Sequence, residues 1–127
     1  MNWVEDEFFV RPEMFETVFR PFGITSRSVA LYRPRAILES VVQIEIPLRA
    51  DVDVDHIPYR LCRCGERKYV RNPIDYVPRP RSGPGPIFKS NQDFRASYPY
   101  VFVSQELYRA IQASGLRGAE FLPCRPA

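Results

Sequence analysis

The side chains best suited to chemistry lie between positions 51 and 64 of this 127-residue chain. Cys62-Arg63-Cys64-Gly65 is close to a C-x-x-C-G zinc half-site but is one residue shorter. A tetrahedral zinc site needs four ligands, and His56 and Cys124 are the two that remain to complete it. We expect no metal and no cofactor; if zinc binds, its ligands would be His56, Cys62, Cys64 and Cys124. The alternative is a strand with one buried and one exposed thiol.

A row of carboxylates precedes the cysteines. Asp51, Asp53 and Asp55 alternate with two valines, so an extended chain places the three carboxylates on one face. Mg²⁺ or Ca²⁺ would suit such oxygen ligands, but the pattern of a calcium-binding loop is missing. A solvated face, or a contact surface for a basic partner, fits better. The predicted partner-binding residues are Glu45, Asp51, Asp53 and Asp55.

The single histidine, His56, follows Asp55 directly. A histidine beside a carboxylate can act as a general base with its orienting group, which makes a hydrolase or transferase built around His56 one hypothesis. No G-x-S-x-G nucleophile motif accompanies it. We therefore predict no catalytic residues and a protein that is not an enzyme.

A basic hairpin is predicted after the carboxylates. Two strands are predicted on either side of Gly65-Glu66, over Tyr59–Cys64 and Arg67–Arg71. Tyrosines between cations on such a hairpin can stack nucleic-acid bases; the residues are Tyr59, Arg60, Arg63, Arg67, Lys68, Tyr69 and Arg71. A small nucleic-acid or regulatory binding module using the Arg-rich hairpin 59–71 is thus the alternative function.

Six further segments are predicted before position 104. Pro12 suits the first turn of a helix over 12–19, in which Phe15, Val18 and Phe19 share a face. Alternation in 41–48 predicts a strand, with Pro47 at an edge or bulge. Shorter strands are predicted at 29–32, 87–89 and 98–103, and a Pro/Gly-rich loop at 72–86.

The C-terminal unit has the clearest signals. Ser104 is a plausible N-cap, and Leu107 and Ile111 share the face expected to enter the core. Gly115 fits the left-handed position that ends a helix. A return strand is predicted over 119–122. Together the segments predict one α+β domain, mostly an antiparallel sheet with one or two short helices packed on it.

Composition excludes several classes. Hydrophobic residues at 45% and charged residues at 26% are typical of a globular domain. No apolar run approaches the ~20 residues of a membrane helix, and no secretory signal is visible, so a cytoplasmic protein without membrane contact is expected. A net charge of +3 is too small to indicate a nucleic-acid binder. Charge is nevertheless segregated, with acidic blocks at 1–16 and 39–55 and a basic block at 60–81.

The segment 98–123 resembles the C-terminal signature of bacterial immunity proteins from polymorphic toxin systems. The matching residues are Tyr100 to Leu107, then Ile111, Gly115-Leu116, Gly118 and Glu120-Phe121-Leu122-Pro123. The subgroup it looks most like is the double-CXXCG-motif immunity family of myxobacteria, in which a cysteine pair followed by glycine precedes this unit. Here that motif is shortened to Cys62-Arg63-Cys64-Gly65, and a second copy is missing.

The resemblance implies a function. Proteins of these families are not enzymes; each binds a cognate toxin one to one and blocks it, usually by covering its active site. The expectation is therefore a single immunity-like domain over 1–127 whose partner is a toxin protein. The sequence leaves open the toxin, the binding surface and whether the chain forms a homodimer.

Overall fold

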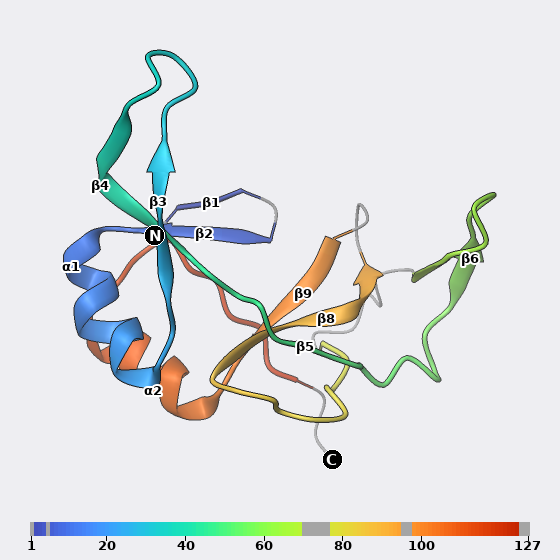
Figure 1. Cartoon of the computed structure of the whole chain (residues 1–127). Helices are drawn as coiled ribbons and strands as arrows, with labels where there is room; N and C mark the ends of the chain where they lie inside the picture. The colour runs from blue at the N-terminus through green and yellow to red at the C-terminus, as the bar shows by residue number, and fades with distance from the viewer. Residues whose placement is uncertain (1, 5, 70–76, 95–97, 125–127) are drawn as a thin grey trace.

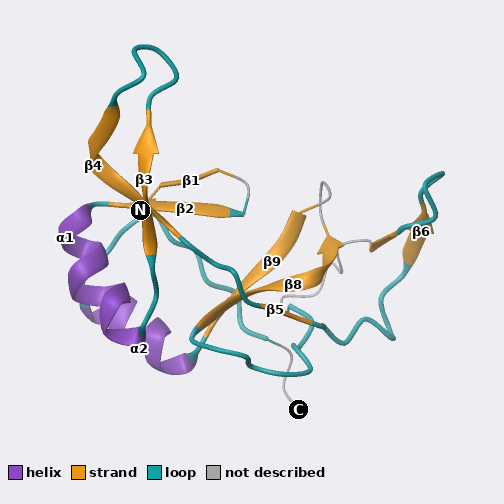
Figure 2. Ribbon diagram, in the orientation of Figure 1, coloured by secondary structure: helices purple, strands orange, loops and turns teal. Residues whose placement is uncertain are grey.

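The computed structural model describes residues 2–4, 6–69, 77–94 and 98–124. Its N-terminal part is a four-stranded antiparallel sheet in the order β1-β2-β4-β3 (Figure 1). The strands are β1 (Asn2–Val4), β2 (Glu7–Val10), β3 (Ser26–Ala30) and β4 (Ile37–Ile44). Figure 2 shows helices lying to one side of these strands, so the predicted α+β class is confirmed.

A continuous helical segment connects β2 to β3. It begins as α1 (Pro12–Met14), continues as a π-helical turn η1 (Phe15–Phe19) and ends as a 3₁₀ turn η2 (Arg20–Phe22). Pro12 occupies the first turn as predicted, and Gly23 ends the segment with a φ of +76°. The side chains of Phe15, Val18 and Phe19 are all buried. The predicted helix over 12–19 is therefore confirmed, and it extends by one turn.

A second sheet lies beside the first. Its strands are β5 (Arg49–Ala50), β8 (Ile87–Phe94) and β9 (Tyr98–Val103), with β8 central, antiparallel to β9 and parallel to β5. The predicted strand at 98–103 is confirmed, whereas the one at 87–89 is longer than predicted. In the described residues the predicted hairpin is formed by β6 (Tyr59–Leu61) and β7 (Arg67–Tyr69); its first strand is shorter than the predicted 59–64, and positions 70 and 71 of the second prediction lie outside the described residues.

Helix α2 (Gln105–Ala113) follows β9 directly. The Ser104 hydroxyl accepts a hydrogen bond from the Leu107 N–H at 3.2 Å, and Gly115 follows the helix with a φ of +72°. Leu107 and Ile111 are buried, and they share a core with Phe15. The predicted cap, core face and glycine stop are confirmed.

Three strand predictions were wrong in whole or in part. Residues 119–122 form no strand; Phe121 instead packs edge-on against Tyr108, with ring centres 5.1 Å apart, and the chain first pairs at Cys124 with Val77. The strand predicted at 41–48 is β4 at 37–44, because the chain leaves the first sheet before Pro47 and joins the second at Arg49. The strand predicted at 29–32 is β3, which ends at Ala30.

Strand β8 separates two hydrophobic cores. Ile87 belongs to the core of the first sheet and helices, whereas Phe88 packs with Val52, Phe94 and Phe102. Neighbouring residues of a strand point to opposite faces, so one strand serves both cores. This arrangement leaves the β3–β4 and β6–β7 hairpins projecting from the body at separate places (Figure 1). In the described ranges we find no helix with the length and apolarity to cross a membrane.

Candidate functional site

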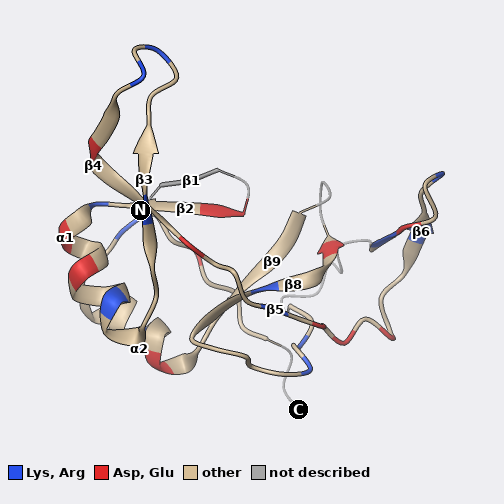
Figure 3. Ribbon diagram, viewed as in Figure 1, with Lys and Arg blue, Asp and Glu red and all other residues tan. Residues whose placement is uncertain are grey.

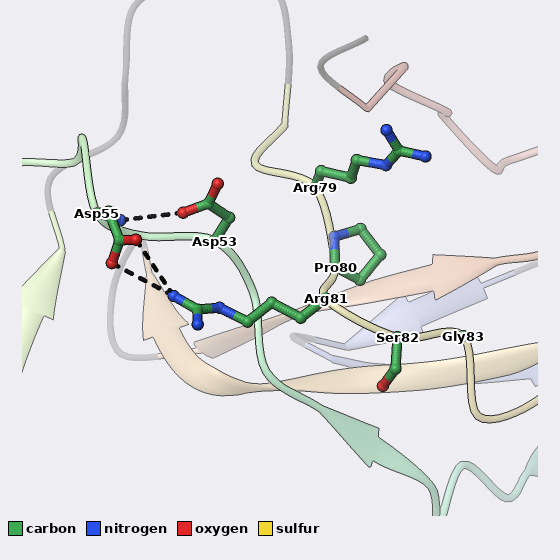
Figure 4. A pocket seen from close by; sticks show the side chains of 7 residues that line it. All are labelled: Asp53, Asp55, Arg79, Pro80, Arg81, Ser82 and Gly83. Carbon is green, nitrogen blue, oxygen red and sulfur yellow. Dashed lines mark hydrogen bonds and ion pairs between the residues drawn. The ribbon is translucent and has the colours of Figure 1, made fainter. Parts of the chain in front are cut away.

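The predicted acidic row borders a shallow groove. Residues 51–53 run antiparallel to 79–81. The Asp53 N–H donates a hydrogen bond to the Arg79 carbonyl at 2.9 Å, and the Arg81 N–H donates one to the Asp51 carbonyl at 2.7 Å. The open depression beside them has a volume of about 720 Å³. It is lined by Asp53, Asp55, Arg79, Pro80, Arg81, Ser82 and Gly83 (Figure 4).

The groove carries both signs of charge. Arg81 reaches across it and places Nη2 at 3.3 and 3.4 Å from the two carboxylate oxygens of Asp55. A carboxylate oxygen of Asp53 accepts the Asp55 N–H at 3.3 Å, while the Arg79 side chain points away from this pair (Figure 4). Since both partners of the Arg81–Asp55 pair are more than half exposed, the pair holds the loop only weakly.

Asp51 and Glu45 lie outside this groove. A carboxylate oxygen of Asp51 accepts hydrogen bonds from the side-chain amides of Asn91 at 2.8 Å and Gln92 at 3.3 Å. Glu45 follows β4, where its N–H bonds the carbonyl of Thr25. The structure thus brings Asp53 and Asp55 together, holds Asp51 against β8 and places Glu45 at the end of the first sheet.

Sequence reasoning missed the arginines of this groove. The signal that could have found them is the charge segregation, because Asp55 belongs to an acidic block and Arg81 to the basic block. The spacing of 26 residues between them cannot be read from local patterns. The predicted alternation of buried and exposed side chains is present, because Val52 is fully buried and the three aspartates are exposed.

The candidate zinc ligands are not assembled. Cys62 and Cys64 lie in the turn of the β6–β7 hairpin, His56 is exposed in a turn before β6, and Cys124 lies opposite Val77. Across residues 2–4, 6–69, 77–94 and 98–124, no three His, Cys, Asp or Glu side chains gather in a way that could hold a metal ion. All three cysteines are free thiols.

The β6–β7 hairpin displays an aromatic and cationic surface. The Arg67 guanidinium lies 4.6 Å from the centre of the Tyr59 ring, and Tyr59 contacts Tyr69 edge-on at 6.0 Å. Tyr69 in turn packs against Phe94 of β8 at 5.6 Å, which anchors the hairpin to the second core. Leu61 is exposed at its edge. Figure 3 shows the cations of this hairpin standing clear of the body.

The tip of the β3–β4 hairpin is a surface that sequence reasoning missed. Tyr32 is 79% exposed and Ile37 is 66% exposed, and Leu31 lies beside them. The Arg33 guanidinium lies 5.4 Å from the Tyr32 ring centre, and Arg35 adds a second cation to the same loop (Figure 3). The sequence signal was a Leu-Tyr pair between a short strand and an Arg-Pro-Arg turn.

No protein-family model, no curated protein and no solved structure matches this chain. The surfaces described above are therefore the basis for assigning a function. They comprise the acidic and basic groove, the cationic β6–β7 hairpin and the apolar tip of the β3–β4 hairpin.

Proposed function

We propose that this chain is a cytoplasmic immunity protein that binds a bacterial toxin protein and blocks it by occlusion, with the β3–β4 tip as its main contact. The β3–β4 tip consists of the loop 31–36 and the first residue of β4; its side chains are Leu31, Tyr32, Arg33, Arg35 and Ile37. The observation that carries the proposal is the exposure of Tyr32 and Ile37 together on a projecting hairpin.

The composition of the β3–β4 tip suits a protein interface. Tyrosine and arginine are enriched among the residues that contribute most to binding energy, and they act from the centre of a contact. Covering the exposed rings and aliphatic chains contributes about 25 cal/mol for each Å² of apolar area removed from water. A projecting loop of this kind can also enter a concave surface, which is the shape of most active sites.

The partner class follows from the sequence resemblance of 98–123 to immunity proteins. A toxin inhibitor needs a surface complementary to its target, and the two arginines of the β3–β4 tip favour an acidic rim on that target. The acidic residues Glu45, Asp51, Asp53 and Asp55 are a second proposed contact, suited to a basic cleft.

The test is coexpression with the protein encoded by the adjacent reading frame, chosen for a toxic C-terminal domain. The wild-type chain should protect the host cell and copurify with the toxin in equal amounts. The double variant Tyr32→Ala/Ile37→Ala should lose protection and weaken binding at least tenfold. The matched control is Tyr59→Ala/Leu61→Ala on the other hairpin, which should keep both. Full protection by the first variant, or none by the wild-type chain, would disprove the proposal.

The acidic residues are tested in the same assay. Reversal of Asp51, Asp53 and Asp55 to lysine adds positive charge around the groove and should weaken binding if a basic cleft is the target. Circular dichroism and thermal melting would show that the variant folds. Unchanged binding and protection would remove the acidic residues from the interface and leave the β3–β4 tip as the contact.

A nucleic-acid or regulatory binding module is the second candidate function. It is favoured by one observation, the stacking of Arg67 over Tyr59 on the exposed β6–β7 hairpin. Aromatic rings beside cations bind single-stranded bases, and phosphate contacts make that binding salt-dependent. Fluorescence anisotropy with a labelled single-stranded RNA and DNA, repeated at rising salt, would test it. No binding at low salt would exclude this function.

A further inference from the structure

The turn of the β6–β7 hairpin holds two cysteines close together. The Cys62 N–H bonds the Glu66 carbonyl at 2.8 Å, and the Gly65 N–H bonds the Cys62 carbonyl at 2.9 Å. Gly65 has a φ of +86°, which a residue with a side chain rarely adopts. These bonds fold residues 62–66 into a tight turn, and Cys62 and Cys64 both lie within it.

The sulfur of Cys62 lies over the backbone of Cys64. The Cys64 N–H points to this sulfur, with nitrogen and sulfur 3.5 Å apart. A disulfide needs Cα atoms about 4.4–6.8 Å apart. Two successive Cα steps of about 3.8 Å, bent in a turn, fall within that range. A turn at this spacing is compatible with the Cα separation of a disulfide, and the Cys62 sulfur already lies beside Cys64.

The surroundings of Cys62 favour its thiolate form. Hydrogen bonds from the side chain and backbone of Cys64 lower the pKa of the Cys62 thiol, and the charge of Lys68 lowers it further; desolvation and the charge of Glu66 oppose this shift without cancelling it. A thiolate is the form that attacks a disulfide. Cys62 is partly exposed and so can reach a small oxidant, and the exposed Cys64 can lose its proton to solvent and act as the resolving thiol.

We propose that Cys62 and Cys64 form a reversible disulfide by exchange with a small-molecule disulfide of the glutathione type. The Cys62 thiolate attacks one sulfur of the oxidant, forms a mixed disulfide and releases the first thiolate. Cys64 then loses its proton to solvent and attacks the Cys62 sulfur, which expels the second thiolate. The oxidant gains two electrons and becomes two thiols, and the cysteine pair loses two electrons and becomes a disulfide. This site is independent of the toxin proposal.

Arg63 gives the experiment a direct readout. Trypsin cleaves after arginine, so digestion separates Cys62 from Cys64 unless a bond joins them. The full-length protein is equilibrated at several ratios of reduced to oxidised glutathione, quenched with acid, alkylated and digested. In oxidised samples we expect the peptides ending at Arg63 and beginning at Cys64 to remain linked until a reductant is added. Cys124 should be alkylated throughout.

Three variants separate the steps. Cys64→Ser should stop at a single glutathione on Cys62, because the resolving thiol is missing. Cys62→Ser should react more slowly than the wild-type chain at neutral pH and should stop at a single glutathione on Cys64, because the attacking thiol is missing. Cys124→Ser is the matched control and should form the linked peptides as the wild-type chain does.

Four results would overturn the proposal. The first is three alkylated cysteines at every glutathione ratio, and the second is a separate glutathione on each of Cys62 and Cys64. The third is a disulfide between two chains, and the fourth is linkage that requires Cys124. Circular dichroism of each variant would confirm that the fold is kept.

Discussion

The ammonium group of Lys89 lies 2.9 Å from a carboxylate oxygen of Glu7, and 2.8 Å from one of Asp6. Lys89 is only 5% exposed. The side-chain amide of Gln43 donates to the other oxygen of Glu7 at 2.7 Å, and Arg27 donates to Gln43 at 3.0 Å. This polar network joins β8 of the second sheet to β2, β4 and β3 of the first.

The position of Lys89 explains why a charge is buried there. It lies two residues after Ile87 on the face of β8 that meets the first sheet. A buried ammonium group is stable only when acceptors replace the water it loses. Asp6 and Glu7 supply them from a part of the chain 82 positions away. The ion pairs therefore specify how the two sheets fit together.

We predict that Lys89→Met destabilises the protein by about 3 kcal/mol, because it leaves two neighbouring carboxylates without their cation in a half-buried place. Urea unfolding followed by circular dichroism measures the change. The control is Lys68→Met on the exposed hairpin, expected to change stability by less than about 0.5 kcal/mol. Equal losses of unfolding free energy in the two variants would show that the buried network does not stabilise the fold.

Local signals of the fold could be predicted from sequence, and contacts between distant segments could not. Ser104 and Gly115 lie at the two ends of one helix, so their roles as N-cap and helix stop follow from residue type and spacing. The boundary of β4 was misplaced because apolar alternation continues through Ile46, while the chain changes sheets there. The expected strand over 119–122 is missing, and Phe121 packs instead against Tyr108 of helix α2.

The same division applies to the candidate site. Alternation over 51–55 correctly placed the aspartates outside and Val52 inside. The alternation could not show that Arg81 pairs with Asp55 or that Asn91 donates a hydrogen bond to Asp51. Those contacts form only because residues 77–86 and strand β8 pack beside residues 51–55 in the folded chain. The β3–β4 tip was missed because exposure of an apolar side chain depends on what the rest of the fold leaves uncovered.

Removal of the α2 cap should weaken the helix. In Ser104→Ala the Leu107 N–H loses the hydroxyl that accepts its hydrogen bond, and we expect a loss of about 1 kcal/mol. Gln112→Ala, on the exposed side of the same helix, is the control and should leave stability within about 0.5 kcal/mol. Chemical denaturation of both variants gives the comparison. A cap variant as stable as the control would contradict the assigned role of Ser104.

Leu107 is the expected centre of packing between α2 and the N-terminal helical segment. It is fully buried, in the same core as Phe15 and Phe19. Leu107→Ala should cost about 3 kcal/mol, from lost apolar burial and the cavity that remains. Leu122→Ala removes the same atoms from a side chain that is 51% exposed and should cost less than about 1 kcal/mol. If the urea midpoint falls by the same amount in Leu107→Ala and Leu122→Ala, Leu107 is not the centre of this packing.

The thiols of Cys62 and Cys124 should differ in the pH at which they react. Hydrogen bonds from Cys64 lower the pKa of Cys62 from its usual 9.0, so its thiolate persists as the pH falls below that value. Partial burial raises the pKa of Cys124, so this thiol is half ionised only at a pH above 9.0.

Iodoacetamide labelling across pH, read by peptide mapping, should therefore give midpoints on opposite sides of 9.0. In concentrated urea the two midpoints should converge, because unfolding removes both the hydrogen bonds and the burial. If the midpoints already coincide in the folded protein, the hydrogen bonds from Cys64 do not activate Cys62.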